Sequence, residues 1–343
     1  MNKLPKLSKG NKVAIVSPSF AAPAVWPHVL DLGLRRIRDM FGLEPIVFPA
    51  ASKLNATLDE KAEDLVAAFI DPEIKAVIST IGGDIQVTYI KTLPSKPFKN
   101  NPKPFFGFSD NSHIANFLYL NEIPSFYGAA LFTQFARQGA MDEFTVEYIN
   151  HALFDAGEFE LRSSRKYNDI GLGWDDPDLL SRHRVYEPHE GWIWDGLNNA
   201  QGLLWGGCVE SVDEMLRHGI SIPSLDQFSE IVLMLETSEE IPSADYVMRV
   251  IRAFGERGIL ERVNGLCIGR PQAWNFDRQS TSEEKAAYRK KQQETILKVV
   301  RDYNKDIPIV QNMDFGHTDP QIPMPYGNLI RIDSSKNQIF ATF

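Results

Sequence analysis

The chain has 343 residues, of which 43% are hydrophobic and 24% are charged, and its formal net charge is −9. This composition is that of a folded globular protein, so an intrinsically disordered chain is excluded. The excess of acidic residues also argues against a nucleic-acid polymer as partner, because such polymers are bound through clusters of lysine and arginine.

The chain lacks the signatures of several other protein classes. Its two cysteines, Cys208 and Cys267, are too few for a disulfide scaffold and lack the paired spacing of a metal site. The seven histidines show no His-Glu-x-x-His spacing, which disfavours a metallohydrolase, and we expect neither a metal nor a cofactor. The basic segment 1–9 leads into no apolar stretch, and no run approaches the ~18 apolar residues of a membrane span. We therefore expect a cytoplasmic protein without a membrane partner.

The length predicts two domains of roughly 150 residues, with a single α/β barrel as the competing architecture. Over the first third of the chain, short apolar strands alternate with amphipathic helices. Strands are expected at 13–17, 46–48, 76–81 and 104–107, and helices at 30–41 and 58–69. Apolar strands that alternate with helices favour a parallel sheet covered on both faces.

Between about Phe159 and Asn199 the apolar residues follow neither the helical nor the strand period, and the segment is rich in Asp, Arg, Gly, Pro and Trp. This composition indicates an interdomain connection with a functional loop. Further strands and helices of a second α/β unit are expected downstream, at 209–216, 231–235, 246–254, 266–268, 282–302 and 307–310, with a terminal hairpin at 329–332 and 338–341. The pattern predicts a domain over 1–160, a connection with an aromatic substrate loop over 161–200, and a second domain over 201–343.

Ser109 follows an apolar strand at a sharp strand-to-helix junction, in the sequence Gly107-Phe108-Ser109-Asp110. Such a junction presents a hydroxyl above the sheet edge, and the N–H groups at the start of the helix point toward any oxyanion beside it. A serine that merely caps the helix is the alternative. Because Asp110 is the better cap, we interpret Ser109 as a candidate nucleophile.

Two downstream residues and one upstream loop complete a hydrolytic site. Glu236 ends an apolar strand and His317 lies in a glycine-bearing loop; with Ser109 they could supply the imidazole orienter, the general base and the nucleophile. A surface carboxylate and a backbone-bonded loop histidine are the alternatives. Paired glycines at Gly82-Gly83 follow another strand, so Gly83 could donate its N–H to an oxyanion, unless this is a plain turn.

Five motifs, in this order and over almost the whole chain, resemble the LD-carboxypeptidase family of serine peptidases: Gly82-Gly83-Asp84, Gly107-Phe108-Ser109-Asp110, Gly206-Gly207, Leu235-Glu236 and Gly316-His317. The resemblance implies an α/β protein of two domains, an N-terminal mostly parallel sheet flanked by helices and a C-terminal α/β domain, with the active site at their interface. It implies a homodimer as well. It makes Ser109 the nucleophile, His317 the general base and Glu236 its orienter, with an oxyanion hole from the amides of Gly83 and Asp110.

The family has two branches, murein tetrapeptide carboxypeptidases and microcin immunity peptidases. The aromatic loop with Trp174, Trp192 and Trp194 resembles the immunity branch, in which a tryptophan stacks on the nucleobase of a peptidyl or aminoacyl nucleotide. Asp84, Trp192 and Trp194 are accordingly the expected substrate-binding residues, with interface packing as the alternative for the tryptophans.

The prediction is therefore a serine carboxypeptidase-type amide hydrolase with a small peptide or aminoacyl-nucleotide substrate. A murein tetrapeptide carboxypeptidase of cell-wall recycling is the alternative. A non-catalytic small-ligand-binding module is the alternative from another class, because two α/β domains around a cleft also describe many binding proteins.

Overall fold

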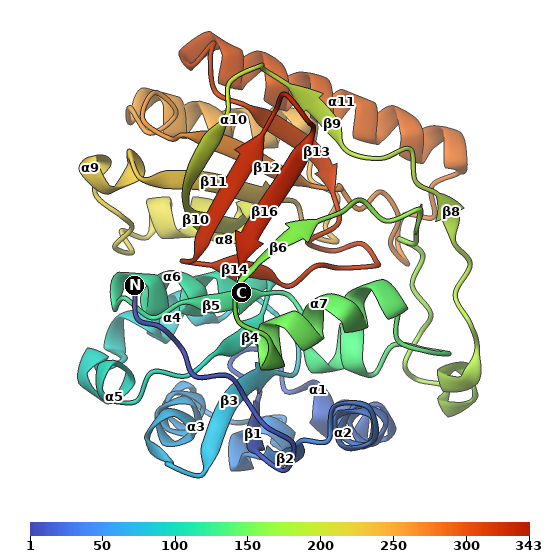
Figure 1. Cartoon of the computed structure of the whole chain (residues 1–343). Helices are drawn as coiled ribbons and strands as arrows, with labels where there is room; N and C mark the ends of the chain where they lie inside the picture. The colour runs from blue at the N-terminus through green and yellow to red at the C-terminus, as the bar shows by residue number, and fades with distance from the viewer.

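The computed structural model describes the chain from Met1 to Phe343, and its first half builds a six-stranded sheet (Figure 1). In spatial order the strands are β14 (Met324–Tyr326), β5 (Ser125–Tyr127), β4 (Phe105–Gly107), β3 (Ile74–Ser79), β1 (Lys12–Val16) and β2 (Glu44–Val47). Strands β1 to β5 pair in parallel, and β14 pairs antiparallel to β5. Except for the edge strand β2, the strands are buried along most of their length, as the near-continuous apolar runs require.

Helices connect these strands, and their ends follow from the local sequence. They are α1 (Ala22–Val25), α2 (Pro27–Phe41), α3 (Leu58–Ile70), α4 (Gln86–Tyr89), α5 (Ser95–Asn100), α6 (Ser112–Leu120) and α7 (Glu143–Phe154). Helix α2 starts at Pro27, whose fixed φ suits a first helical position, and it stops before Gly42 in the left-handed region. Helix α3 starts with a capping box in which Thr57 and Glu60 satisfy each other's backbone N–H groups.

The second half supplies seven strands of an eight-stranded sheet, drawn above the first in Figure 1, and β6 comes from the end of the first half. In spatial order the strands are β6 (Glu158–Leu161), β16 (Gln338–Thr342), β15 (Leu329–Asp333), β10 (Ala200–Cys208), β11 (Ile231–Glu236), β12 (Gly265–Gly269), β13 (Ile309–Met313) and β9 (Ile193–Asp195). Strands β10 to β13 are parallel, and the remaining pairings are antiparallel. A separate two-stranded ribbon joins β7 (Lys166–Tyr167) to β8 (Glu187–Pro188).

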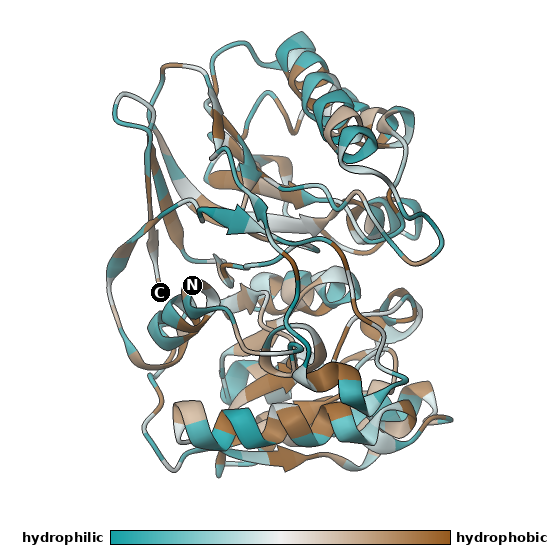
Figure 2. Ribbon diagram, turned by 90° about the vertical axis from the view of Figure 1, so that its right-hand side faces the viewer, coloured by the Kyte–Doolittle hydropathy of each residue, from teal (hydrophilic) through white to brown (hydrophobic).

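Four helices accompany the second sheet: α8 (Val209–Arg217), α9 (Leu225–Phe228), α10 (Ala244–Glu256) and α11 (Ser282–Tyr303). The longest, α11, begins with a capping box at Thr281 and is mostly hydrophilic in Figure 2, which matches the expected surface helix. None of the helices combines the length and the apolar character that crossing a bilayer requires.

The predicted fold class, two α/β domains with a mostly parallel N-terminal sheet, is confirmed, and a single barrel is wrong. The predicted terminal hairpin is present as β15 and β16. The domain boundaries at residues 160 and 200 stay a prediction. Both sheets recruit strands from outside the predicted domains, because β9 lies in the predicted connection and β14 returns to the N-terminal sheet.

A buried apolar cluster runs through both halves and includes Phe106 and Phe126 of the first sheet and Leu233 and Val310 of the second. A smaller cluster lies on the first sheet beneath α3 and α5. Fully buried Trp205 of β10 spans the boundary, since its indole Nε1–H donates to Asn116 Oδ1 of α6 at 3.1 Å. The two halves are thus joined by hydrophobic packing and by a buried hydrogen bond.

Replacing Trp205 with Phe tests that junction. The variant keeps an aromatic ring but leaves the Asn116 oxygen without its donor, and an unsatisfied buried acceptor costs about 1–3 kcal/mol of stability. We expect urea denaturation to report a loss of that size. The matched variant Trp194→Phe, at a half-buried position whose indole makes no hydrogen bond, should stay within about 0.5 kcal/mol of the wild type. Equal losses in both variants would contradict the assigned role of the hydrogen bond.

Candidate active site

Ser109 stands at the carboxyl end of β4, in a short 3₁₀ turn that leads directly into α6. Its φ is 63°, a left-handed conformation that non-glycine residues rarely adopt. Such strain persists only where the surrounding structure imposes it, and it is common at active sites. The loop after β3 presses closely on this turn, because a Cβ on Gly82 would lie 2.8 Å from Ser109 Cβ. The serine side chain is thereby fixed at the sheet edge.

Glu236 and His317 meet at the corresponding edge of the second sheet. Glu236 ends β11 and is 1% exposed, while His317 lies in the loop between β13 and β14. His317 Nδ1 lies 2.7 Å from Glu236 Oε2, a hydrogen bond that fixes the orientation of the ring. Gly316 has a φ of 92°, and a Cβ there would lie 2.4 Å from the same carboxylate oxygen. A side chain at position 316 would therefore displace Glu236.

The structure brings Ser109 and His317 to one cavity but does not join them by a hydrogen bond. Instead, His317 Nε2 lies 3.0 Å from Glu239 Oε2, just beyond the end of β11. Burial favours neutral imidazole, yet the carboxylates of Glu236 and Glu239 outweigh it and hold the pKa of His317 well above its ordinary value. In return, although partial burial opposes the shift, the charge of His317 lowers the pKa of Glu239 to about 2.

The expected oxyanion donors lie beside Ser109. Gly83 lines the same cavity, with a φ of 150°. Asp110 follows the serine within the 3₁₀ turn, and its buried side chain accepts a hydrogen bond from the Gln86 N–H at 3.2 Å. Asp84, the expected substrate-binding carboxylate, is exposed and does not line the cavity.

The cavity has a volume of about 510 Å³ and takes its walls from both halves of the chain. Aromatic rings form much of one side, where Trp26 packs edge-on against Trp174 with ring centroids 5.1 Å apart and against Phe20 at 6.0 Å. Trp174 belongs to the predicted aromatic loop. Phe20 and Trp26 follow β1, and the sequence analysis missed them because it attached no function to that strand end, although parallel strands collect sites there.

The expectation that Trp192 and Trp194 bind the substrate is not supported, because neither residue lines the cavity. Trp192 Nε1–H donates to buried Asp314 Oδ2 at 2.9 Å, and Trp194 is held in β9 opposite Val310 of β13. These contacts correspond to the packing alternative. Of the three tryptophans in the predicted loop, the cavity receives Trp174.

Tyr127 of β5 is a site residue that the sequence did not indicate. Its hydroxyl donates to Glu236 Oε1 at 2.6 Å and accepts from the Ser109 N–H at 3.1 Å. Complete burial, followed by the charge of Glu236, raises the pKa of Tyr127 well above its ordinary value, so the hydroxyl stays protonated. Tyr127 therefore links the candidate nucleophile's backbone to the candidate imidazole orienter.

Buried ion pairs hold the connecting segment against the cavity. Asp169 pairs with Lys285 at 2.9 Å and with Arg289, and Asp319 pairs with Arg137. Arg184 Nη2 donates to Gln138 Oε1 at 2.6 Å, and Nη1 lies 3.6 Å from Asp319. Each of these carboxylates already has a cationic partner.

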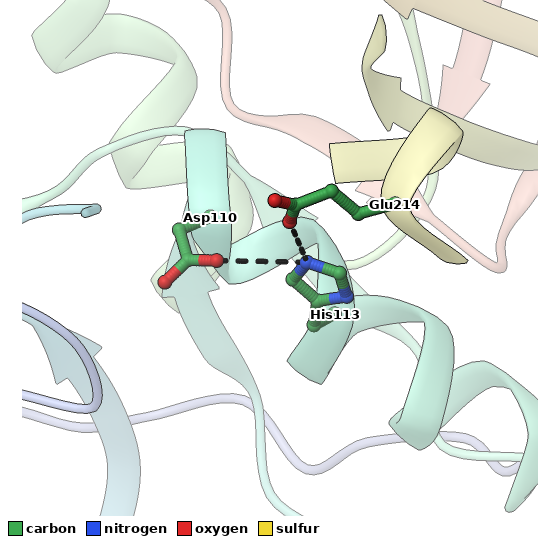
Figure 3. Close-up of side chains that lie close together, drawn as sticks. All are labelled: Asp110, His113 and Glu214. Atoms are coloured by element: carbon green, nitrogen blue, oxygen red, sulfur yellow. Dashed lines mark hydrogen bonds and ion pairs between the residues drawn. The ribbon is translucent and has the colours of Figure 1, made fainter. Parts of the chain in front are cut away.

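A second group of titratable side chains includes Asp110, the residue after Ser109 (Figure 3). His113 Nε2 of α6 lies 3.6 Å from Asp110 Oδ1 and 3.2 Å from Glu214 Oε2 of α8. One atom of each side chain lies within 4.8 Å of the others, so this group could hold a metal ion. The group joins the Ser109 turn to α8 of the second half.

Comparison with known proteins agrees with this architecture. The chain matches the LD-carboxypeptidase N-terminal domain over residues 13–128 and the LD-carboxypeptidase C-terminal domain over residues 201–332. YocD of Bacillus subtilis (strain 168) is 24% identical over 336 residues, which cover 96% of this chain and 95% of YocD. The microcin C7 self-immunity protein MccF of Escherichia coli is 22% identical over 300 residues, covering 84% of this chain and 79% of MccF.

Among solved structures, an MccF-like protein from Streptococcus pneumoniae in complex with AMP superposes with a TM-score of 0.84 at 25% identity. The superposition covers 97% of this chain and 98% of that one. The two family matches together span most of the chain, in the order that the sequence motifs require. The chain therefore belongs to the LD-carboxypeptidase family of serine peptidases.

Proposed function

We propose that the protein is a serine carboxypeptidase-type amide hydrolase that acts on peptidyl or aminoacyl nucleotides, with Ser109, His317 and Glu236 as its triad. The observation that carries this proposal is the shared cavity, in which Ser109 and His317 lie together with the aromatic wall of Trp26 and Trp174. The same cavity thus offers a nucleophile and a flat apolar surface on which a nucleobase can stack. Its volume of about 510 Å³ suits a small-molecule ligand.

In the proposed reaction His317 Nε2 takes the proton of Ser109 Oγ as the oxygen attacks the substrate carbonyl. The backbone N–H groups of Gly83 and Asp110 hold the tetrahedral oxyanion. His317 then donates its proton to the leaving nitrogen, and water, activated by the same imidazole, hydrolyses the acyl-enzyme. Glu236 holds the ring through Nδ1 and stabilises the imidazolium formed in each half of the reaction.

A nucleotide is favoured as one part of the substrate because the MccF-like protein of Streptococcus pneumoniae was solved with AMP. Stacking of a base on an aromatic ring contributes about 1–3 kcal/mol, so Trp26 and Trp174 could supply much of the binding energy. The homodimer and the cytoplasmic location implied earlier stay predictions.

The Ser109→Ala variant tests the triad. We expect its kcat on an aminoacyl-sulfamoyl adenosine to fall by up to ~10⁶-fold, because the acyl route needs the hydroxyl. Hydrolysis is measured by chromatography, and circular dichroism checks that the variant is folded. A serine-directed phosphonate should add its mass to Ser109 of the wild type. Retention of more than a few per cent of activity by a folded variant would refute the assignment.

Tyr127→Phe tests the link between Ser109 and Glu236. The variant loses a hydrogen bond to a buried carboxylate, an interaction of about 1.5–3 kcal/mol, so kcat should fall roughly tenfold to a hundredfold. Tyr119→Phe is the matched control, because Tyr119 is also buried but its hydroxyl makes no hydrogen bond. An unchanged kcat in the Tyr127 variant would remove this residue from the mechanism.

Trp174→Ala tests the aromatic wall and distinguishes the two substrate classes. Loss of about 1–3 kcal/mol of stacking should raise KM for an aminoacyl-sulfamoyl adenosine by about fivefold to a hundredfold. The control Trp194→Ala changes a tryptophan outside the cavity and should leave KM unchanged. If the wild type cleaves a murein tetrapeptide ending in D-Ala and not the adenosine compound, the nucleotide proposal is wrong and cell-wall recycling takes its place.

A further inference from the structure

We propose that Glu239 selects the substrate by binding a cationic group on its acyl residue, and that this contact frees His317 for Ser109. The cation is an ammonium or guanidinium close to the scissile carbonyl. The inference rests on the proposed function, because it assigns His317 the part of general base. It adds a specificity residue and a substrate class to that site.

The starting point is the position of the imidazole between two carboxylates. Nδ1 lies 2.7 Å from Glu236 Oε2 and Nε2 lies 3.0 Å from Glu239 Oε2. A ring that donates from both nitrogens is an imidazolium and has no lone pair for a proton. Ser109 cannot be activated while this arrangement holds. Turnover therefore requires the carboxylate of Glu239 to leave Nε2.

Glu239 is free to make that move, whereas Glu236 is not. The Glu239 side chain is 61% exposed, and among the ion pairs of the structure its partner is His317 alone. Its main chain is anchored, because the Glu239 carbonyl accepts a hydrogen bond from Asn275 Nδ2 at 2.8 Å. Glu236 is buried and also held by Tyr127. A rotation of one side chain is therefore enough to expose Nε2.

The charges around the cavity indicate what draws Glu239 away. The lining carboxylates Asp169 and Asp319 already pair with lysine or arginine. Arg184, the lining arginine, is engaged by Asp319 and Gln138. An anionic group on the acyl residue would find no free cation among these side chains. A cationic group would find the carboxylate of Glu239, next to the reacting atoms.

Asp175 is the remaining lining carboxylate, and it accepts a hydrogen bond from Trp26 Nε1 at 2.8 Å. That contact assigns Asp175 to the aromatic side of the cavity, where the nucleobase of the substrate is proposed to stack. Glu239, by contrast, directly contacts the proposed catalytic base. The negative charge of Glu239 attracts a cationic substrate group and repels an anionic one, so both effects favour a cationic substrate.

Binding of a cation also changes the protonation of the base. The titratable groups in contact with His317 are Glu236 and Glu239, and Phe108 packs edge-on against the ring at 5.0 Å. When Glu239 pairs with a substrate cation, the imidazole loses one of the two charges that raise its pKa. The neutral base then becomes available at lower pH. Substrate binding and activation of Ser109 are thereby coupled.

The test compares four sulfamoyl adenosines, with lysyl, norleucyl, glutamyl and N-acetyl-norleucyl groups, on the wild type, Glu239→Gln and the matched control Glu240→Gln. Glu240 is the neighbouring exposed carboxylate, and it forms no ion pair in the structure. The lysyl–norleucyl comparison isolates a side-chain cation, and the norleucyl–acetyl comparison isolates the α-ammonium. The readouts are kcat/KM, its pH profile and the melting temperature.

We expect the wild type to favour the cationic member of at least one pair by about tenfold or more in kcat/KM, and to disfavour the glutamyl compound. Glu239→Gln should reduce that preference to within about threefold. In the pH profile of kcat/KM for the N-acetyl substrate, the acid limb of Glu239→Gln should lie at lower pH than that of the wild type. The reason is that activity requires neutral His317, and the variant lacks one of the two carboxylates that raise the pKa of His317. Glu240→Gln should match the wild type in both readouts.

Equal rates for cationic and neutral substrates in the wild type would overturn the inference. Three results for Glu239→Gln would overturn it as well. They are an unchanged preference for the cationic substrate, an acid limb of the kcat/KM profile at the same pH as in the wild type, and loss of all activity in a normally folded variant. Failure of the wild type to cleave any of the four compounds is a different result. It would refute the proposed function, and the inference with it.

Discussion

The carboxylate of Glu236 is a buried charge, and the arrangement of the whole site follows from its need for partners. An ionised carboxylate removed from water costs several kcal/mol unless it is paired and hydrogen-bonded. Here one oxygen accepts from Tyr127 of the first sheet and the other contacts His317 of the second half. The same two contacts thus satisfy the charge, join the halves and orient the proposed base. A change in the relative position of the halves would disturb stability and chemistry together.

The proposed catalytic groups share a simple geometric origin. Gly83, Ser109 and Glu236 follow the carboxyl ends of the parallel strands β3, β4 and β11, and His317 follows β13. In parallel sheets these ends lie at one edge, where loops are free to carry function. Two such edges face each other across the cavity. Each half therefore contributes an incomplete set of groups.

This origin explains which features the sequence could reveal. Apolar runs that end in Ser109, Glu236 or a glycine pair are local patterns, and they predicted both the strands and the candidate triad. Tyr127 and β14 could not be found in this way, because their roles depend on partners far away in the chain. Glu239 lies three residues after Glu236 and has the ordinary appearance of a surface carboxylate. Its significance arises only when the fold brings His317 beside it.

The tryptophans show the limit of reasoning from composition. Trp174, Trp192 and Trp194 occupy one irregular segment, and residue type alone does not distinguish a ring that faces ligand from a ring that packs. The distinction comes from tertiary contacts, since Trp192 reaches the buried carboxylate of Asp314 and Trp194 is fixed in a strand pair. Phe20 and Trp26 reach the cavity from the N-terminal part of the sequence, about 150 residues before Trp174.

The return of β14 to the N-terminal sheet has a consequence for how the protein is made. Residues Met324–Tyr326 emerge from the ribosome long after β5, the strand beside which they lie, and after the other four strands of the sheet. Until then the edge of β5 is uncovered, and Tyr127 and Ser109 belong to a sheet that lacks its last strand. An uncovered edge is prone to pair with other chains. The growing chain therefore exposes this edge from the synthesis of β5 until that of β14, and the sheet that carries Ser109 and Tyr127 is complete only then.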